Sequence, residues 1–172
     1  MAVALIVTAL LPPDIFAWAE GLRRAHFPPE RNLVPAHLTL FHALPPSAED
    51  EARRLLARTA REWTPVAASI SRLLDLGKGT ALAVDSAGMD ALRADLAHHL
   101  HGLLSAQDDH PPRLHITIQN KVAKDAARAL QAELGKTLRR RDFLFAGLAL
   151  HRYLGGPWAP LGMWSFSGKK RG

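Results

Sequence analysis

HLTL at residues 37–40 and HITI at residues 115–118 are the two most similar segments of this 172-residue chain. Each tetrad places a histidine two positions before a threonine, with aliphatic residues between and after them. Side chains on a β-strand alternate between its two faces, so this spacing predicts a polar and an apolar face. His37 and Thr39 would share the polar face of one strand, as His115 and Thr117 would on another. The tetrads therefore predict two half-buried strands that each present an imidazole and a hydroxyl.

An internal repeat places the two tetrads in register. His115 follows His37 by 78 positions, and the same displacement brings residues 3–7 onto residues 81–85 and Gly77 onto Gly155. The hydrophobic periodicity predicts strands and helices in alternation. We expect strands at residues 2–10, within 33–41, and at 66–76, 80–85, 113–119, 143–154 and 161–166, and helices at 14–26, 47–63, 91–104 and 124–138.

This order predicts an α+β fold built by an α/β-type duplication. We expect a single bilobal domain over residues 1–172, with repeat halves at about 1–78 and 79–156 and a final strand. The two pseudo-symmetric lobes would each contain a mixed or antiparallel sheet with helices outside and a central cleft between them. If the lobes pack about a pseudo-twofold axis, both polar strand faces line that cleft.

Composition excludes several classes of protein. Hydrophobic residues make up 48% and charged residues 22%, as in globular domains. The absence of cysteine excludes a disulfide framework, a thiolate metal site and a cysteine nucleophile. No apolar run approaches the roughly 20 residues that span a bilayer, and residues 2–11 lack a preceding Lys or Arg. We expect a cytoplasmic monomer without a membrane segment.

The charge favours an anionic partner. The formal net charge is +6, with basic clusters at residues 139–141 and in the tail at 169–171, which we expect to be a solvated end. An imidazole has an ordinary pKa of about 6.5, so a pair can hold one neutral and one protonated ring near neutral pH. One ring can then take a proton while the other donates one, and threonine hydroxyls can bind phosphate oxygens. This set suits phosphoryl transfer without a metal.

The tetrads and their surroundings, PAHLTLFHAL and RLHITIQNKV, resemble the 2H phosphoesterase superfamily. Within it, the chain is most similar to the bacterial 2'-5' RNA ligase family, also described as RNA 2',3'-cyclic phosphodiesterases. The resemblance covers about residues 2 to 166. It implies hydrolysis of a 2',3'-cyclic phosphate to a 2'-phosphate, with reversible joining of RNA ends through a 2'-5' linkage as related chemistry. It also implies that His115 acts as base and His37 as acid, while Thr39 and Thr117 bind the phosphate.

Further candidates for substrate contacts lie near the tetrads or the second glycine turn: Phe41, His42, Lys121, Arg152 and Tyr153. The Phe41 ring can stack on a nucleobase or pack in the core, and His42 can line the cleft or its rim. Lys121 can supply a positive charge where family members carry an arginine after the second tetrad. We expect Trp158 and Trp164 to be packing residues of the last hairpin.

A metal site is the weaker interpretation of the remaining histidines. His98, His99 and His101 would spread around a helix instead of converging, and no cysteine or His-Glu-x-x-His pattern accompanies them or His110. We therefore expect neither a metal nor a cofactor.

Three hypotheses remain open from the sequence. The first is a metal-independent cyclic phosphodiesterase acting on RNA with a cyclic phosphate end or on a small cyclic nucleotide. The second is a non-catalytic RNA- or phosphate-binding module that uses the tetrads only to hold phosphate. The third is a metal-dependent hydrolase using His37, His115 and His110. The choice between tRNA halves, an oligonucleotide and a nucleotide is not encoded in a readable motif.

Overall fold

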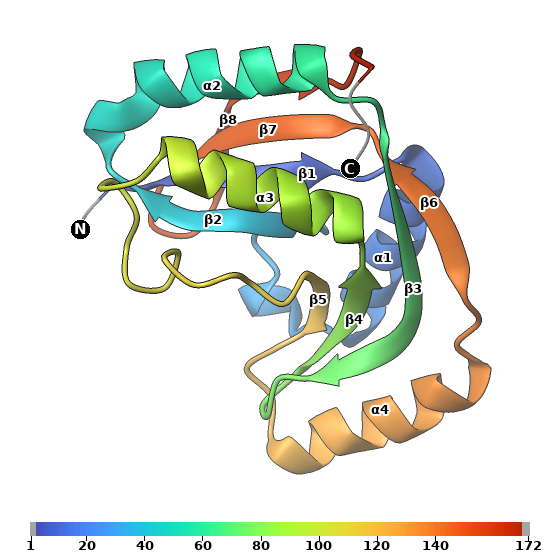
Figure 1. Ribbon diagram of the computed structural model, residues 1–172. Helices are drawn as coiled ribbons and strands as arrows, with labels where there is room; N and C mark the ends of the chain where they lie inside the picture. Colours follow the sequence, from blue (N-terminus) through green and yellow to red (C-terminus); the bar gives the residue numbers. More distant parts are fainter. Residues whose placement is uncertain (1–2, 170–172) are drawn as a thin grey trace.

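The computed structural model describes residues 3–169, which form four helices and eight strands (Figure 1). In chain order they are β1 (Leu5–Leu10), α1 (Pro13–His26), β2 (Leu38–Leu44), α2 (Glu49–Glu62), β3 (Val66–Asp75), β4 (Thr80–Asp85), α3 (Ala87–His99), β5 (His115–Gln119), α4 (Lys124–Thr137), β6 (Arg141–Phe145), β7 (Gly147–Tyr153) and β8 (Trp158–Ser165). The order β-α-β-α-β thus occurs twice and is followed by β7 and β8. Residue 2 of the expected first strand and residues 170 and 171 of the basic tail lie outside the described residues.

Two four-stranded antiparallel sheets carry the fold, in the orders β2-β1-β7-β8 and β5-β4-β3-β6. The expected α+β class is confirmed, and every strand pair among the described residues is antiparallel. Each sheet has one tetrad strand at its edge, β2 in the first and β5 in the second. The strand β3 belongs to the first repeat half in sequence but pairs with β4 in the second sheet. The hairpin turn between them contains Gly77, whose φ of 82° matches the left-handed turn at Gly155, where φ is 90°.

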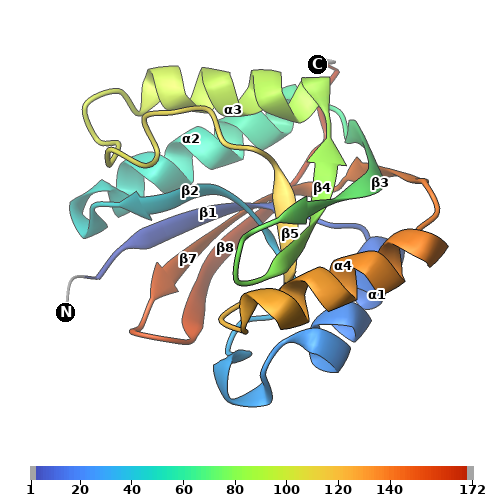
Figure 2. The same cartoon turned by 90° about the horizontal axis from the view of Figure 1, so that it is seen from below.

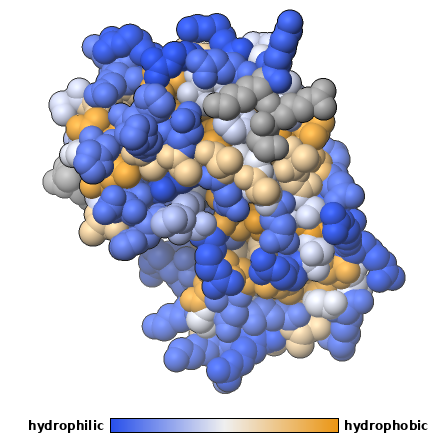
Figure 3. Space-filling view, in the orientation of Figure 1, coloured by the Kyte–Doolittle hydropathy of each residue, from blue (hydrophilic) through white to orange (hydrophobic). Residues whose placement is uncertain are grey.

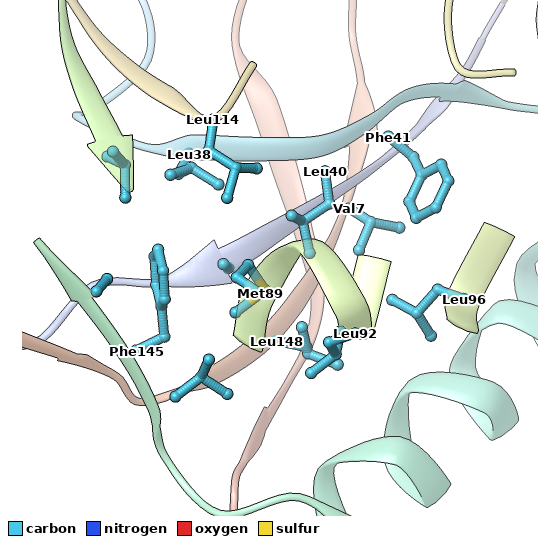
Figure 4. Packing of buried hydrophobic residues seen from close by; sticks show 14 of the residues in the cluster. Val7, Leu38, Leu40, Phe41, Met89, Leu92, Leu96, Leu114, Phe145 and Leu148 are labelled. Atoms are coloured by element: carbon cyan, nitrogen blue, oxygen red, sulfur yellow. The ribbon is translucent and has the colours of Figure 1, made fainter. Parts of the chain in front are cut away.

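The apolar faces of the tetrad strands form part of the core. Leu38 and Leu40 are fully buried, and Figure 4 shows Leu38 beside Leu114 and Leu40 beside Val7 of β1. Ile116 of β5 joins the same cluster. Burying an aliphatic side chain of this size stabilises the fold by about 1.5–3 kcal/mol, so these residues fix the register of both strands.

The helices cover the sheets from two sides. Helix α2 packs against β7 and β8, and α3 packs against β3. In both views these two helices lie on the same side of the molecule (Figures 1 and 2). Helix α1 packs against β5 of the second sheet, and α4 packs against β3 and β4 of the same sheet. The packing of α1 matters for function, because this helix starts beside the first tetrad's sheet and ends against the second tetrad's strand.

The single strand expected at residues 143–154 is wrong. Two strands occupy this stretch, β6 in one sheet and β7 in the other, and they separate at Ala146. The amide of Ala146 donates to the carbonyl of Leu10, and its own carbonyl accepts from the amide of Phe166. The chain therefore crosses between the sheets at a residue whose two backbone groups are both hydrogen-bonded. The apolar residues continue through this crossing, so the sequence pattern gives no sign of it.

Two helix starts also differ from the expectation. The helix expected at residues 91–104 is α3, which begins at Ala87 because the Ser86 hydroxyl accepts a hydrogen bond from the Met89 amide. The expected start at Ser47 lies in a short 3-10 turn, Pro46–Ala48, and α2 begins after it without a side-chain cap.

The surface is mainly polar on the face drawn in Figure 3, with apolar side chains in a band across its middle. Among the described residues, no helix combines the length and the apolar character needed to cross a bilayer.

Candidate active site

The two tetrad histidines have the same hydrogen-bonding arrangement. The Nδ1 atom of His37 lies 2.8 Å from the carbonyl oxygen of Pro35, and that of His115 lies 2.6 Å from the carbonyl oxygen of Arg113. A carbonyl oxygen only accepts, so Nδ1 of each ring carries the proton. Each backbone carbonyl thereby fixes the tautomer and the orientation of its histidine, and leaves Nε2 for a reacting group.

The tetrads alternate as the sequence predicts. Their four aliphatic residues are buried, whereas the histidines and threonines are partly exposed. Thr39 pairs with Thr8 of β1, and Thr117 pairs with Ala81 of β4. Strand β2 of the first sheet contacts strand β5 of the second sheet. The two polar faces consequently meet at the junction of the two sheets.

The environment of His37 keeps its ring neutral. Burial lowers the pKa of His37 from 6.5 to about 4, against the opposing effect of the Pro35 carbonyl hydrogen bond. The charges of Arg23, His151 and His115 lower this pKa further. These effects place His115 and Arg23 within electrostatic reach of His37, and they make His37 a neutral imidazole near neutral pH in the unliganded protein.

An apolar pocket of about 350 Å³ opens beside His37. Its walls include Phe16, Leu33 and Trp158. The Trp158 ring lies 4.5 Å from the His37 ring and 5.2 Å from the His151 ring, between ring centroids. A cavity of this size with an aromatic wall can hold one heteroaromatic ring. Trp158 is therefore more than the packing residue of the last hairpin that we expected from the sequence.

A hydrogen-bonded pair, buried Thr8 and half-buried His151, lines this pocket. The Thr8 hydroxyl is hydrogen-bonded to Nε2 of His151 over 2.9 Å, and Thr8 is 4% exposed. Burial lowers the pKa of His151, which favours the neutral form of this ring. The sequence analysis missed Thr8 and His151, because each stands alone in its strand without a recognisable motif.

Phe41 and His42 do not extend the polar face. Phe41 is fully buried, and the guanidinium of Arg93 lies 4.1 Å above its ring, so the ring is not available to stack on a nucleobase. His42 donates from its backbone amide and from Nδ1 to the carboxylate of Asp108. This contact joins β2 to the loop that leads into β5. His42 therefore lies at the edge of the site, where its ring holds this loop in place.

Arg152 lies away from the tetrads. It pairs with Leu5 of β1, whereas its neighbour His151 pairs with Ile6 and faces the pocket. Neighbouring residues point to opposite faces, and the Arg152 guanidinium accordingly forms an ion pair with Glu49 of α2. Its side chain therefore contacts the helix side of the sheet, and the substrate contact expected for Arg152 stays a prediction.

Tyr153 and Lys121 remain candidates for substrate contacts. Tyr153 pairs with Trp158 across the last hairpin, next to the pocket wall. Lys121 follows β5 with an exposed side chain and a left-handed backbone, φ 60°. Its backbone amide donates a hydrogen bond to the side-chain oxygen of Asn120.

Three buried charged residues near the tetrads were missed from the sequence: Arg23 on α1, Arg93 on α3 and Asp108 in the loop before β5. A signal for Arg23 was available: it follows Ile15 and Ala19 at intervals of four, on the buried stripe of the helix. Asp108 had no such signal, because it lies in a loop.

The described residues contain no group of three His, Asp or Glu side chains arranged to hold a metal ion. His98 and His99 contact each other edge to face, and Nδ1 of His99 bonds to the carbonyl of Asp95.

The comparison with known families decides the classification. The sequence model of the 2'-5' RNA ligase superfamily matches residues 11–157, which include both tetrads, all of the second sheet, and strands β2 and β7 of the first. The chain belongs to this superfamily. This is a superfamily of enzymes of the phosphoesterase and RNA ligase type.

Solved structures of this superfamily's fold cover nearly the whole chain. TT0787 of Thermus thermophilus superposes with a TM-score of 0.70 at 18% identity, over 97% of this chain and all of that one. LigT of E. coli in complex with 3'-AMP gives 0.64 at 20% identity, and in complex with NADP+ 0.62 at 21%, each over 95% of this chain and 98% of LigT. At the level of sequence, no curated protein matches the chain.

Proposed function

We propose that this 2'-5' RNA ligase superfamily member is a metal-independent phosphodiesterase that hydrolyses 2',3'-cyclic phosphates of RNA ends or nucleotides to 2'-phosphates. One observation carries the proposal: His37 and His115 are equivalently held through Nδ1 at the edges of two facing sheets, and each leaves Nε2 for a reacting group. Two such groups on either side of one phosphorus atom are what in-line displacement requires.

The reaction proceeds as follows. Nε2 of His115 takes a proton from water while the water oxygen forms a bond to phosphorus. The bond between phosphorus and the 3' oxygen breaks, and Nε2 of His37 donates a proton to that oxygen. The Thr39 and Thr117 hydroxyls donate hydrogen bonds to the non-bridging oxygens, which carry the negative charge. The product is a 2'-phosphate with a free 3' hydroxyl, and attack by a 5' hydroxyl in place of water would give a 2'-5' linkage.

The acid role of His37 depends on the bound substrate. In the unliganded protein its pKa is about 4, so the ring carries no proton on Nε2 near neutral pH. A cyclic phosphate carries a full negative charge, and this charge next to the imidazole raises the pKa of His37. Substrate binding would then favour the protonated form of His37, because the negative charge of the phosphate opposes the effect of burial on the pKa of this ring.

The pocket beside His37 suits the nucleobase of the terminal nucleotide. Its wall is the Trp158 ring, and base stacking on an aromatic side chain contributes about 1–3 kcal/mol. Stacking accepts any base, and the polar side chains that line the pocket, Thr8 and His151, bond to each other. LigT, whose fold this chain shares, is known in complexes with 3'-AMP and NADP+, which supports a nucleotide as the kind of ligand.

Phosphorus NMR of EDTA-treated protein with a nucleoside 2',3'-cyclic phosphate tests this function. We expect conversion to the 2'-phosphate alone, with turnover lowered about 10²–10⁴-fold in His37→Gln and His115→Gln. His99→Gln is the matched control, because it removes an exposed histidine whose described contacts lie within its own helix.

Two results would contradict the proposal. Wild-type turnover in either tetrad variant would exclude the two-histidine mechanism. An unchanged cyclic resonance, with both the nucleotide and an RNA that ends in a cyclic phosphate, would instead favour the non-catalytic binding module.

A further inference from the structure

Arg23 is a buried cation that connects both halves of the site. It lies near the end of α1 and is 4% exposed. Its Nε donates to the side chain of Asn32 over 3.0 Å, and one terminal nitrogen donates to the carbonyl of Thr117 over 2.9 Å. The guanidinium lies 4.3 Å above the Phe27 ring. A single side chain thus holds the backbone of the second tetrad and the segment that leads into the first.

Other cations near the tetrads do not occupy this position. Arg152 is paired with Glu49 on the helix side of its sheet, and Lys121 is exposed. The other buried arginine of the described chain, Arg93, donates to the carbonyls of Leu40 and Asp108. Arg23 is therefore the buried cation of the described residues that bonds to a tetrad threonine.

We propose that Arg23 is a positioning residue that sets the spacing of the two histidine tetrads and holds a positive charge behind the phosphate site. This inference rests on the proposed function, because it assigns Arg23 a role in the same cleft. A misplacement of about 1 Å can cost a factor of about 10² in rate, so a clamp between the two tetrads affects turnover directly.

The charge of Arg23 reaches the reacting groups. Burial lowers the pKa of Arg23 and the carboxylate of Glu20 raises it, and an arginine stays protonated near neutral pH. His37 is faced by Arg23 from α1, by His151 from β7 and by His115 from β5, and each of these charges lowers its pKa. Arg23 thereby favours a neutral His37 in the free site and also attracts an anion.

Two substitutions separate the clamp from the charge. Arg23→Gln removes both, whereas Arg23→Lys keeps the charge and loses the fixed geometry of the guanidinium. Arg24→Gln is the matched control, because it removes the same charge from the next residue of α1, which is exposed. The readouts are kcat and KM, the pH titration of the His37 ring by NMR, and thermal unfolding.

We expect kcat of Arg23→Gln to fall about 10²-fold, and its His37 ring to titrate at a higher pH than the wild-type value of about 4. Arg23→Lys should keep the wild-type titration and lose part of kcat. Arg24→Gln should match the wild type in both. Should Arg23→Gln fail to fold, the same two readouts on Arg23→Lys decide the question.

Three outcomes would overturn the inference. These are a folded Arg23→Gln with wild-type kcat and titration, an Arg23→Lys with full kcat, and an Arg24→Gln that reproduces the Arg23→Gln effects. The titration requires no turnover. Absence of turnover by the wild-type protein therefore counts against the proposed function alone, while the titration still tests the position and charge of Arg23.

Discussion

The imidazole of His37 lies against the indole of Trp158, with ring centroids 4.5 Å apart and planes tilted by 56°. Trp158 comes from β8, and His37 directly precedes β2 at the opposite edge of the same sheet. The sheet must therefore curl for these two rings to meet. This contact places the proposed acid, His37, beside the proposed wall for the nucleobase, Trp158.

Trp158→Ala should weaken the binding of a nucleoside 2',3'-cyclic phosphate more than it slows turnover. Removing an aromatic platform costs about 1–3 kcal/mol per base, which corresponds to about a 5- to 150-fold rise in KM. Steady-state kinetics measure the effect. Met163→Ala, an exposed residue of the same strand, is the control and should leave KM unchanged. Equal KM values for both variants would exclude Trp158 from the nucleobase site.

Thr39→Val and Thr117→Val should each lower kcat/KM about 10- to 150-fold, because a hydrogen bond to a charged group contributes about 1.5–3 kcal/mol. Valine has nearly the shape of threonine, and both hydroxyls lie on the partly exposed polar face. Unfolding in urea should therefore change little, and the loss should appear in the kinetics. A variant with wild-type kcat/KM would show that its hydroxyl does not bind the phosphate.

The sequence predicted the tetrads well because two constraints act on the same residues. The aliphatic residues must be buried, and the period of two then fixes the face of His37 and His115 without knowledge of the tertiary structure. The strand pairing could not be predicted in this way. The exchange that puts β7 beside β1 depends on a crossing at Ala146, where the hydrophobic pattern continues unbroken.

The pocket residues escaped prediction for a related reason. Trp158 and His151 come from the last hairpin, and Thr8 comes from the first strand. Only the antiparallel pairing of β1 with β7, and of β7 with β8, brings them together. Arg152 shows how much one position along β7 matters, because its side chain pairs with Glu49 on one face of the sheet while neighbouring His151 lines the pocket on the other.

His37 should make the protein less stable as the pH falls from about 6.5 to about 4. Its pKa is about 4 in the folded protein and 6.5 as the ordinary value, so the unfolded chain binds the proton first. The contribution to the free energy of unfolding is complete above pH 6.5 and is lost towards pH 4. It amounts to about 3 kcal/mol at most.

Urea unfolding at several pH values measures this contribution by comparison with His37→Gln. The stability difference between wild type and variant should shrink as the pH falls through this window, because groups common to both proteins cancel. A difference that is independent of pH between 6.5 and 4 would show that the folded protein does not depress the pKa of His37.

Asp108→Asn should destabilise the protein and loosen the loop that leads to His115. The carboxylate is 1% exposed and accepts hydrogen bonds from the amides of His42 and Ala43 and from the His42 ring. Burial raises the pKa of Asp108, and these donors lower it to a net value below the ordinary one. An asparagine amide group would place a donor against a donor there, at a cost of about 1–3 kcal/mol.

Urea unfolding and kcat together identify the cause of this effect. His42→Gln is the comparison, because it removes only the ring contact and keeps both backbone bonds to Asp108. We expect a clear loss of stability and of kcat in Asp108→Asn and a smaller loss in His42→Gln. If Asp108→Asn were as stable as the wild type, the backbone bonds of the carboxylate would contribute nothing net. If it lost stability but kept full kcat, the loop would not position His115.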